Sequence, residues 1–329
     1  MRNVAVLFGL IVCLCVAACS GLGCRTPADG PSSPAIKATI PQIVRTAVGR
    51  SLKKAPAEVT LADLESVREL NLVGADIEDI SFAAHMPNLR IADLRFTRVR
   101  DLRPLAGLQR LWWLSVESTK VSDISPLKDI PVLTKVFLTD TGVSDLAPLK
   151  GLVHLRSLSI EGTGVTDLTP MANLSDLWYF WCDRTKVSSI APLAGMKKLE
   201  KLGLSETKIS DLSPLSDKAL LREMNLFGSQ VSDLTPLSGC RGLENLDLFQ
   251  TPVTDISPLA GLIRLRRLSI GKTGVSSLKP LSGLKNLEYL DFSFTKVDDI
   301  EPLKGLGKLK DVRMFGAPAV ERGAKLPEK

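Results

Sequence analysis

The most regular feature of the chain is a pattern of leucines and other apolar residues that returns at one constant interval. Variants of the phrase Thr-x-Val-x-Asp-Leu mark the repeat, whose first residue falls at Thr97, Thr119, Thr141, Thr163, Thr185, Thr207, Ser229, Thr251, Thr273 and Thr295. Extending the spacing to Ala75 and Ala317 gives twelve turns without an insertion or deletion. Such strict spacing predicts that each turn stacks on the previous one in the same way.

Each turn divides into a half that suits a strand and a half that does not. In one turn Leu202 and Leu204 alternate with non-leucine positions, which is the period of a short strand with one buried face. The segment Asp211 to Pro214 does not suit a strand interior, because Pro has no N–H for the ladder. It suits a short helical turn, in which Asp accepts a backbone N–H as an N-cap and Pro lies in the first turn.

The Asp of this segment is present in nine of eleven turns, with Ser189 and Ser277 in the other two, and Pro is absent only where Phe82 replaces it. A column of stacked carboxylates could also bind calcium. Each Asp, however, is already explained as a cap within its own turn. The sequence therefore predicts no metal site in this column.

The pattern over about residues 60–320 resembles the 22-residue class of leucine-rich repeats found in internalins and other bacterial surface proteins. The resemblance implies an α/β solenoid in the form of a right-handed horseshoe. Its parallel sheet lies on the concave face and short 3-10 turns lie on the convex face. That family often has Asn at the Thr position, so we expect the Thr hydroxyl to take over part of the hydrogen bonding to the neighbouring loop.

Residues 1–18 differ in kind from the repeats. Val4 to Ala18 is an apolar run of about 15 residues, too short to span a bilayer comfortably and typical of a signal-peptide core. It leads to Cys19 in a sequence that resembles the lipobox of bacterial lipoproteins, which implies lipidation of this Cys; ordinary secretion is the alternative. We therefore expect an exported protein anchored by lipid at the bacterial cell envelope, on the outer membrane or periplasmic face, or else a secreted one.

The sequence predicts five segments. Residues 1–18 form the signal peptide and residues 19–36 a flexible tether rich in Ser, Gly and Pro. Residues 37–66 form a helical N-terminal cap, with Thr60 and Asp63 as a capping box. The leucine-rich-repeat domain covers residues 67–320, and residues 321–329 form a polar tail.

Composition and motifs argue against catalysis and against nucleic-acid binding. The net charge of +6 is spread along the chain, without the basic stripe that nucleic-acid binding usually shows. The two histidines, His85 and His154, lie in connecting segments, and no phosphate loop, nucleophile motif or metal-spaced Cys/His set is present in the sequence. Cys182 and Cys240 fall at apolar core positions of the repeat. We expect neither enzyme activity nor a cofactor.

The residues six, four and two positions before the repeat mark alternate with the buried leucines and therefore point into the concave hollow. These 36 positions hold half of the sixteen aromatic residues: Trp113, Phe137, Tyr179, Trp181, Phe227, Phe249, Tyr289 and Phe315. They also hold nine acids, among them Glu117, Glu161, Asp183, Glu223, Asp247 and Asp291. Five bases oppose them: Arg95, Lys135, Lys201, Arg267 and Arg313.

Exposed aromatics ringed by charge are typical of a binding surface. The predicted ligand-binding residues are therefore the eight aromatics together with Glu117, Asp183 and Asp247. The simpler alternative is that strands favour aromatics for their β-propensity. We expect a non-catalytic scaffold that binds a protein partner. The alternatives are a carbohydrate or cell-wall glycan on the same face, or an architectural protein without a specific ligand.

Overall fold

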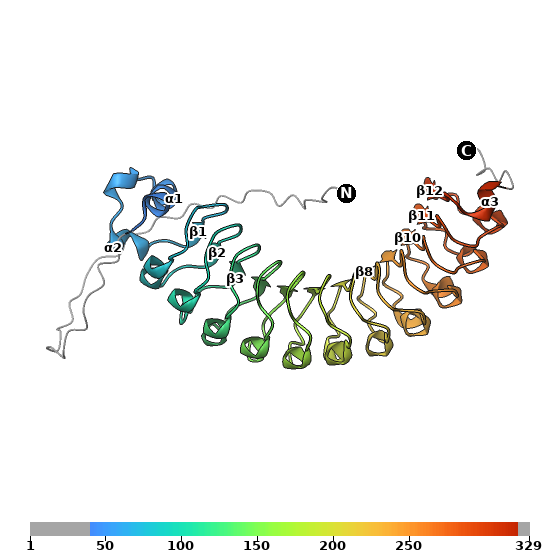
Figure 1. Cartoon of the computed structure of the whole chain (residues 1–329), viewed down its shortest axis with the longest axis horizontal. Helices are drawn as coiled ribbons and strands as arrows, with labels where there is room; N and C mark the ends of the chain where they lie inside the picture. The colour runs from blue at the N-terminus through green and yellow to red at the C-terminus, as the bar shows by residue number, and fades with distance from the viewer. Residues whose placement is uncertain (1–39, 322–329) are drawn as a thin grey trace. The chain divides into compact units, whose positions relative to one another are not determined.

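The computed structural model describes residues 40–321 of the 329-residue chain. They begin with helix α1 (Gln42–Leu52), the 3-10 turn η1 (Pro56–Glu58) and helix α2 (Leu61–Leu64). The predicted capping box is present, since Thr60 Oγ1 accepts from the Asp63 N–H and Asp63 Oδ2 accepts from the Thr60 N–H. These helices lie beside the first turn of the solenoid (Figure 1).

Four predicted features fall outside the described residues: the signal peptide 1–18, the tether 19–36, the lipidation site Cys19 and the tail beyond residue 321. Within residues 40–321, no helix has the length and apolar character needed to cross a membrane.

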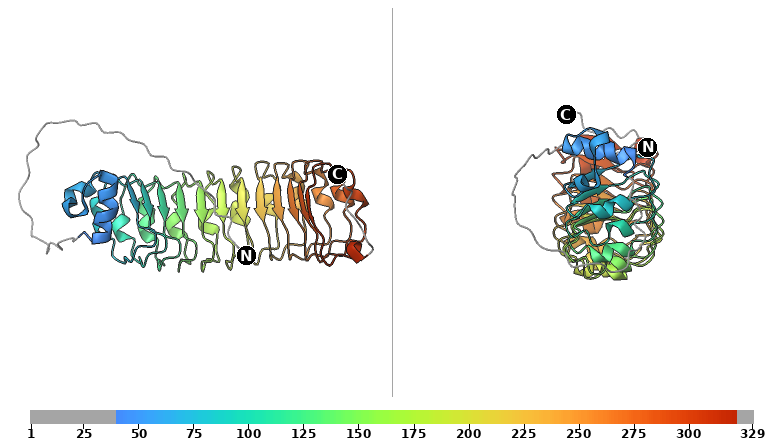
Figure 2. Two further views of the ribbon diagram at one scale, coloured as in Figure 1. Left: turned by 90° about the horizontal axis from the view of Figure 1, so that it is seen from above. Right: turned by 90° about the vertical axis from the view of Figure 1, so that its left-hand side faces the viewer.

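Short strands of three residues each form one parallel sheet in chain order. They are β1 (Glu69–Asn71), β2 (Ile91–Asp93), β3 (Trp113–Ser115), β4 (Lys135–Phe137), β5 (Ser157–Ser159), β6 (Tyr179–Trp181), β7 (Lys201–Gly203), β8 (Glu223–Asn225), β9 (Asn245–Asp247), β10 (Arg267–Ser269), β11 (Tyr289–Asp291) and β12 (Asp311–Arg313). Every residue pairs with its equivalent one repeat later, so Leu202 lies between Phe180 and Met224. Seen from above, the strands run side by side along the described unit (Figure 2).

A 3-10 turn follows each of the first eleven strands. These turns are η2 (Ser81–His85), η3 (Arg103–Leu105), η4 (Ser125–Asp129), η5 (Ala147–Leu149), η6 (Thr169–Met171), η7 (Ala191–Gly195), η8 (Ser213–Leu215), η9 (Thr235–Gly239), η10 (Ser257–Gly261), η11 (Lys279–Leu281) and η12 (Glu301–Leu303). Helix α3 (Pro318–Glu321) follows β12. The strands line the concave side and the 3-10 turns the convex side, which confirms the predicted leucine-rich-repeat architecture (Figure 1).

The core is a stack of leucine columns between the sheet and the 3-10 turns. In the seventh turn Leu199, Leu202 and Leu204 are at most 2% exposed. Burying one leucine side chain stabilises the fold by roughly 2 kcal/mol, so the columns supply the main driving force for stacking. Cys182 and Cys240 lie in the same core as free, fully buried thiols. They pack as small apolar side chains.

The Asp column caps the 3-10 turns, but one position earlier than a helix N-cap. Asp167 Oδ1 accepts from the Thr169 N–H at 2.8 Å, and Thr169 is the first residue of η6. The same bond recurs in all eleven turns, including the two in which Ser189 Oγ and Ser277 Oγ accept at 3.3 Å. The carboxylates are therefore occupied as local turn caps.

The Thr column differs from our expectation. The Thr207 hydroxyl donates to the carbonyl of Leu204 in its own turn at 2.7 Å, and not to the neighbouring loop. All nine threonines of the column make this bond. The contact between adjacent loops is made by the backbone, as where the Lys208 N–H donates to the Val187 carbonyl at 3.0 Å. The Thr hydroxyls are thus used within their own turns.

Candidate ligand-binding face

The structure places all eight predicted aromatics on the concave side of the sheet. Seven are half-buried, and Phe315 is 70% exposed. Six of them form three pairs with ring centroids 5.6 to 5.9 Å apart: Trp113 with Phe137, Tyr179 with Trp181, and Phe227 with Phe249. Such spacing is typical of attractive aromatic contacts. Their role in ligand binding stays a prediction.

Tyr289 has cations instead of a ring as its neighbours. The guanidinium carbons of Arg267 and Arg313, on the two adjoining strands, lie 4.6 and 5.4 Å from its ring centroid. Lys201 lies similarly 6.0 Å from the Tyr179 ring. Cations at these distances hold an aromatic ring in place by their attraction to its face.

Two rings lie over glycines of the following strand or loop. A Cβ on Gly203 would lie 2.9 Å from Cδ1 of Trp181, and a Cβ on Gly271 would lie 2.6 Å from the Phe249 ring. Each glycine stands one repeat after its aromatic, so it occupies the same position in the next turn. The absence of a side chain there leaves room for the ring to lie across the neighbouring strand.

Asp183, a predicted site residue, forms a carboxyl pair with Glu161 beside Trp181, and this pairing was not predicted from the sequence. Burial raises the pKa of the Glu161 carboxyl to about 7, and the hydrogen bond with Asp183 and its charge add to this effect. Asp183 Oδ1 in turn accepts from the N–H and the hydroxyl of Ser205 at 2.5 and 2.6 Å. The Arg184 guanidinium, 4.0 Å from Glu161 and 3.2 Å from Asp140, opposes the shift.

The other two predicted acids have local partners. Asp247 Oδ1 accepts from the Phe249 N–H at 2.9 Å, and burial raises the pKa of this carboxyl. Glu117 accepts from the Ser115 hydroxyl at 3.0 Å and lies 3.9 Å from Arg95 Nε. Both acids therefore have structural partners, and Glu161 is the concave carboxyl whose pKa burial and Asp183 raise to about 7.

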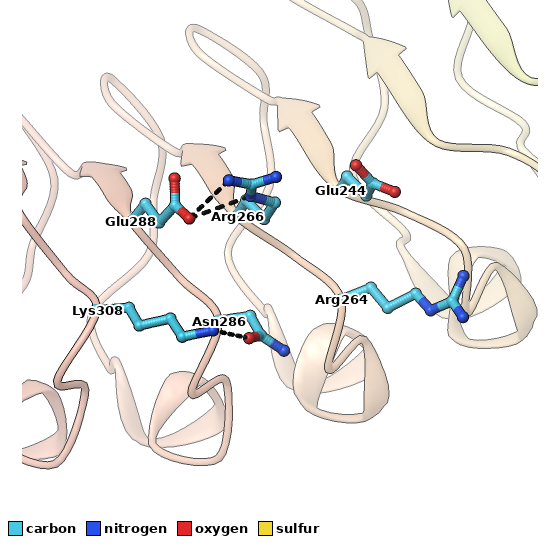
Figure 3. Close-up of a pocket in the computed structure, with 6 residues that line it drawn as sticks. All are labelled: Glu244, Arg264, Arg266, Asn286, Glu288 and Lys308. Atoms are coloured by element: carbon cyan, nitrogen blue, oxygen red, sulfur yellow. Dashed lines mark hydrogen bonds and ion pairs between the residues drawn. The ribbon is translucent and has the colours of Figure 1, made fainter.

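A shallow hollow of about 390 Å³ lies away from these aromatics, on the flank of strands β9 to β12 (Figure 3). Its lining includes Glu244, Arg266 and Glu288, one from each turn. Arg266 Nη2 lies 2.8 Å from Glu288 Oε1, and Arg222 Nη1 lies 3.9 Å from Glu244 Oε1. Arg222, Glu244, Arg266 and Glu288 thus form a charge ladder, in which the sign of the charge alternates from each turn to the next. This ladder can be read from the sequence, but our prediction missed it. Because these charges compensate each other, the ladder is a poor candidate for a binding site.

The two histidines are exposed, and His154 Nδ1 lies 3.8 Å from Asp176. Within residues 40–321, no group of three or more His, Cys, Asp and Glu side chains could hold a metal ion.

Comparisons with known proteins support the repeat architecture. The family profile described as "Leucine Rich repeats (2 copies)" matches residues 263–305. An internalin (InlF) from Listeria monocytogenes is 28% identical, with a TM-score of 0.80, over 84% of this chain and 82% of that one. A leucine-rich-repeat protein of Leptospira interrogans is 17% identical, with a TM-score of 0.65, over 72% and 69%.

The plant peptide hormone receptor RGFR1, solved in complex with RGF2, is 16% identical, with a TM-score of 0.63, over 75% of this chain and 47% of that one. No curated protein matches the sequence. The chain thus folds as a leucine-rich-repeat solenoid similar to that of a bacterial internalin, and this fold is typically non-catalytic.

Proposed function

We propose that this leucine-rich-repeat protein is a non-catalytic scaffold that binds a protein partner through its concave face. The observation that carries the proposal is the set of aromatic pairs on a surface that the leucine core does not need. Aromatic side chains surrounded by charge are the usual centres of protein interfaces. Leucine-rich-repeat proteins commonly bind proteins.

The dimensions of the face support a folded or extended protein ligand. Strands about 4.8 Å apart give the twelve-stranded sheet a length of roughly 50 Å. A stable protein interface buries about 800 Å² on each partner, which a surface of this length accommodates.

The proposal predicts that Phe137→Ala combined with Trp181→Ala weakens partner binding at least about tenfold, because two aromatic pairs on either side of β5 are broken. The measurement is a pull-down from native envelopes, followed by titration of the captured protein. Ile263→Ala, which truncates a side chain 62% exposed in the segment between the turn η10 and β10, is the control. Full retention of binding by the double variant would count against the proposal.

A glycan is the second candidate ligand, because aromatic rings beside carboxylates also suit sugar rings. The rings of Trp181 and Phe249, spread across Gly203 and Gly271, favour it. Arrays of peptidoglycan fragments and glycans probed with the protein separate the two candidates. An absence of glycan binding at high protein concentration removes this candidate. An architectural role without a ligand predicts that neither experiment finds a partner.

The proposed location is the bacterial envelope, with Cys19 as the lipid-bearing residue. Lipidation keeps a protein on a membrane without a spanning helix. The proposal predicts that Cys19→Ala moves the protein from the membrane fraction to the soluble fraction after export. Unchanged membrane association of the variant would contradict lipidation at this residue.

A further inference from the structure

The two ends of the sheet are covered to different degrees. At the first strand, Leu70 and Leu72 are 1% and 3% exposed beneath the helical cap. At the last strand, the equivalent Val312 and Met314 are only partly buried, and the neighbouring Phe315 is 70% exposed. Among the described residues, β12 pairs with β11 alone. Its outer edge is therefore open in this part of the chain.

The backbone of this edge has a defined set of groups that point outward. The Asp311 N–H donates to Glu288, and the carbonyls of Arg313 and Phe315 accept from β11 and the loop that follows it. Since backbone groups of successive strand residues point to opposite sides, the N–H and C=O of Val312 and the N–H of Met314 point away from β11. An exposed strand edge of this kind is a template for another strand.

The side chains that flank Val312 have opposite charges. Asp311 and Arg313 are both exposed and both lie on the concave side. If a second β12 runs antiparallel with its Val312 opposite this Val312, Asp311 lies opposite Arg313 of the other copy, and Arg313 opposite its Asp311. In the same register Phe315 lies opposite Leu309. Directly opposed charges of opposite sign stabilise an antiparallel pair.

We infer that the open edge of β12 binds a second copy of this chain in an antiparallel, two-fold pair centred on Val312. The register uses the outward backbone groups, because the Val312 residues then exchange two N–H···O=C bonds. It also makes the contact self-complementary, as a two-fold interface requires. Pairing with a strand of a different protein would not require opposite charges at equal distances on either side of Val312. The two sheets join edge to edge, and the concave faces open to the same side.

The interface is small, so the dimer is weak and depends on protein concentration. Sedimentation velocity of the purified full chain is expected to show a monomer–dimer equilibrium. Asp311→Arg and Arg313→Asp each place two like-charged pairs in contact and are expected to weaken dimerisation about tenfold or more. Lys201→Glu, on the concave side of β7 away from the edge, is the control and leaves the equilibrium unchanged.

Two further samples distinguish specific pairing in this register from a general effect of net charge on association. The double variant Asp311→Arg/Arg313→Asp restores the opposed charges and recovers dimerisation. An equimolar mixture of the two single variants forms a heterodimer, since one chain then carries two cations and the other two anions at the contact. A wild-type protein that stays monomeric at high concentration overturns the inference, and so does a double variant that fails to recover. A monomer that dimerises only after removal of residues 322–329 also overturns it, and indicates that the tail covers the edge.

Discussion

At the residue scale, the loop that follows each strand contains a left-handed backbone position that residues other than glycine often occupy. The residue before the Thr column has a left-handed backbone in all twelve turns, yet glycine holds it in only four, Gly74, Gly162, Gly228 and Gly316. Phe96 and Phe294 hold it in two others, with side chains 60% and 58% exposed. A left-handed conformation costs a bulky residue roughly 1 kcal/mol. The stack is stable enough to tolerate this cost repeatedly.

The Thr column itself contains one defect, at Ser229. Among the described residues, its buried hydroxyl is a side-chain group without a hydrogen-bond partner. Ser229→Thr restricts the side-chain rotamer to the one that the other threonines use, with the hydroxyl on the carbonyl three residues earlier. We expect the free energy of unfolding to rise by about 1 kcal/mol, measured by urea denaturation. Ser229→Ala serves as the control, and an unchanged or lower stability of the Thr variant contradicts the account.

Glu161 predicts a pH dependence of stability. Its pKa is raised from 4.5 to about 7 in the folded state, so the folded protein keeps a proton that the unfolded chain releases. Stability from this group is therefore full below about pH 4.5 and is lost as the pH rises towards 7. In Glu161→Gln this loss is absent, so the variant gains stability relative to wild type between about pH 5 and 8. Urea denaturation across this pH range measures the free energy of unfolding, with Glu206→Gln at an exposed position as the control. If the free energy of unfolding changes with pH in the same way for both variants and the wild type, the raised pKa of Glu161 is contradicted.

At the element scale, the strands and 3-10 turns were predictable because their determinants recur within every repeat. Leu202, Leu204, Asp211 and Pro214 each indicate the local conformation, and equivalent residues recur in nearly every turn of the stack. The Thr hydrogen bonds were predicted wrongly, since the reach of a Thr hydroxyl depends on the loop geometry and not on the spacing. The direction of the concave side chains followed from strand alternation alone.

Contacts between turns were harder to predict, because they link residues a full repeat apart that no local pattern pairs. The ring of Trp181 over Gly203 and the ion pair between Arg266 and Glu288 both have this separation. A comparison of each position with its equivalent one turn later would have found them. The raised pKa of Glu161 depends on burial beside Asp183, which only the curvature and side-chain packing of the folded sheet determine.

At the scale of the whole molecule, the residues that stabilise the solenoid are separate from the concave aromatic pairs. The leucine columns and the Asp caps hold the stack, and the aromatic pairs lie on the face that neither of them requires. The helical cap closes the first strand, whereas the edge of β12 stays open among the described residues. In the two proposals, recognition of a partner centres on the aromatic pairs of β3 to β9, and pairing of two copies centres on Val312 of β12.

The most direct test of the central claim is site-specific photo-crosslinking in the native envelope. A photoreactive residue replaces Trp181 on the concave face in one variant and the exposed Ile263, between η10 and β10, in another. The account predicts that the Trp181 position captures one defined protein, identified by mass spectrometry, that the Ile263 position does not capture. It also predicts that Phe137→Ala, which leaves the photoreactive position intact, reduces the yield. Equal capture from both positions, or no protein captured from Trp181, would contradict recognition through the concave face.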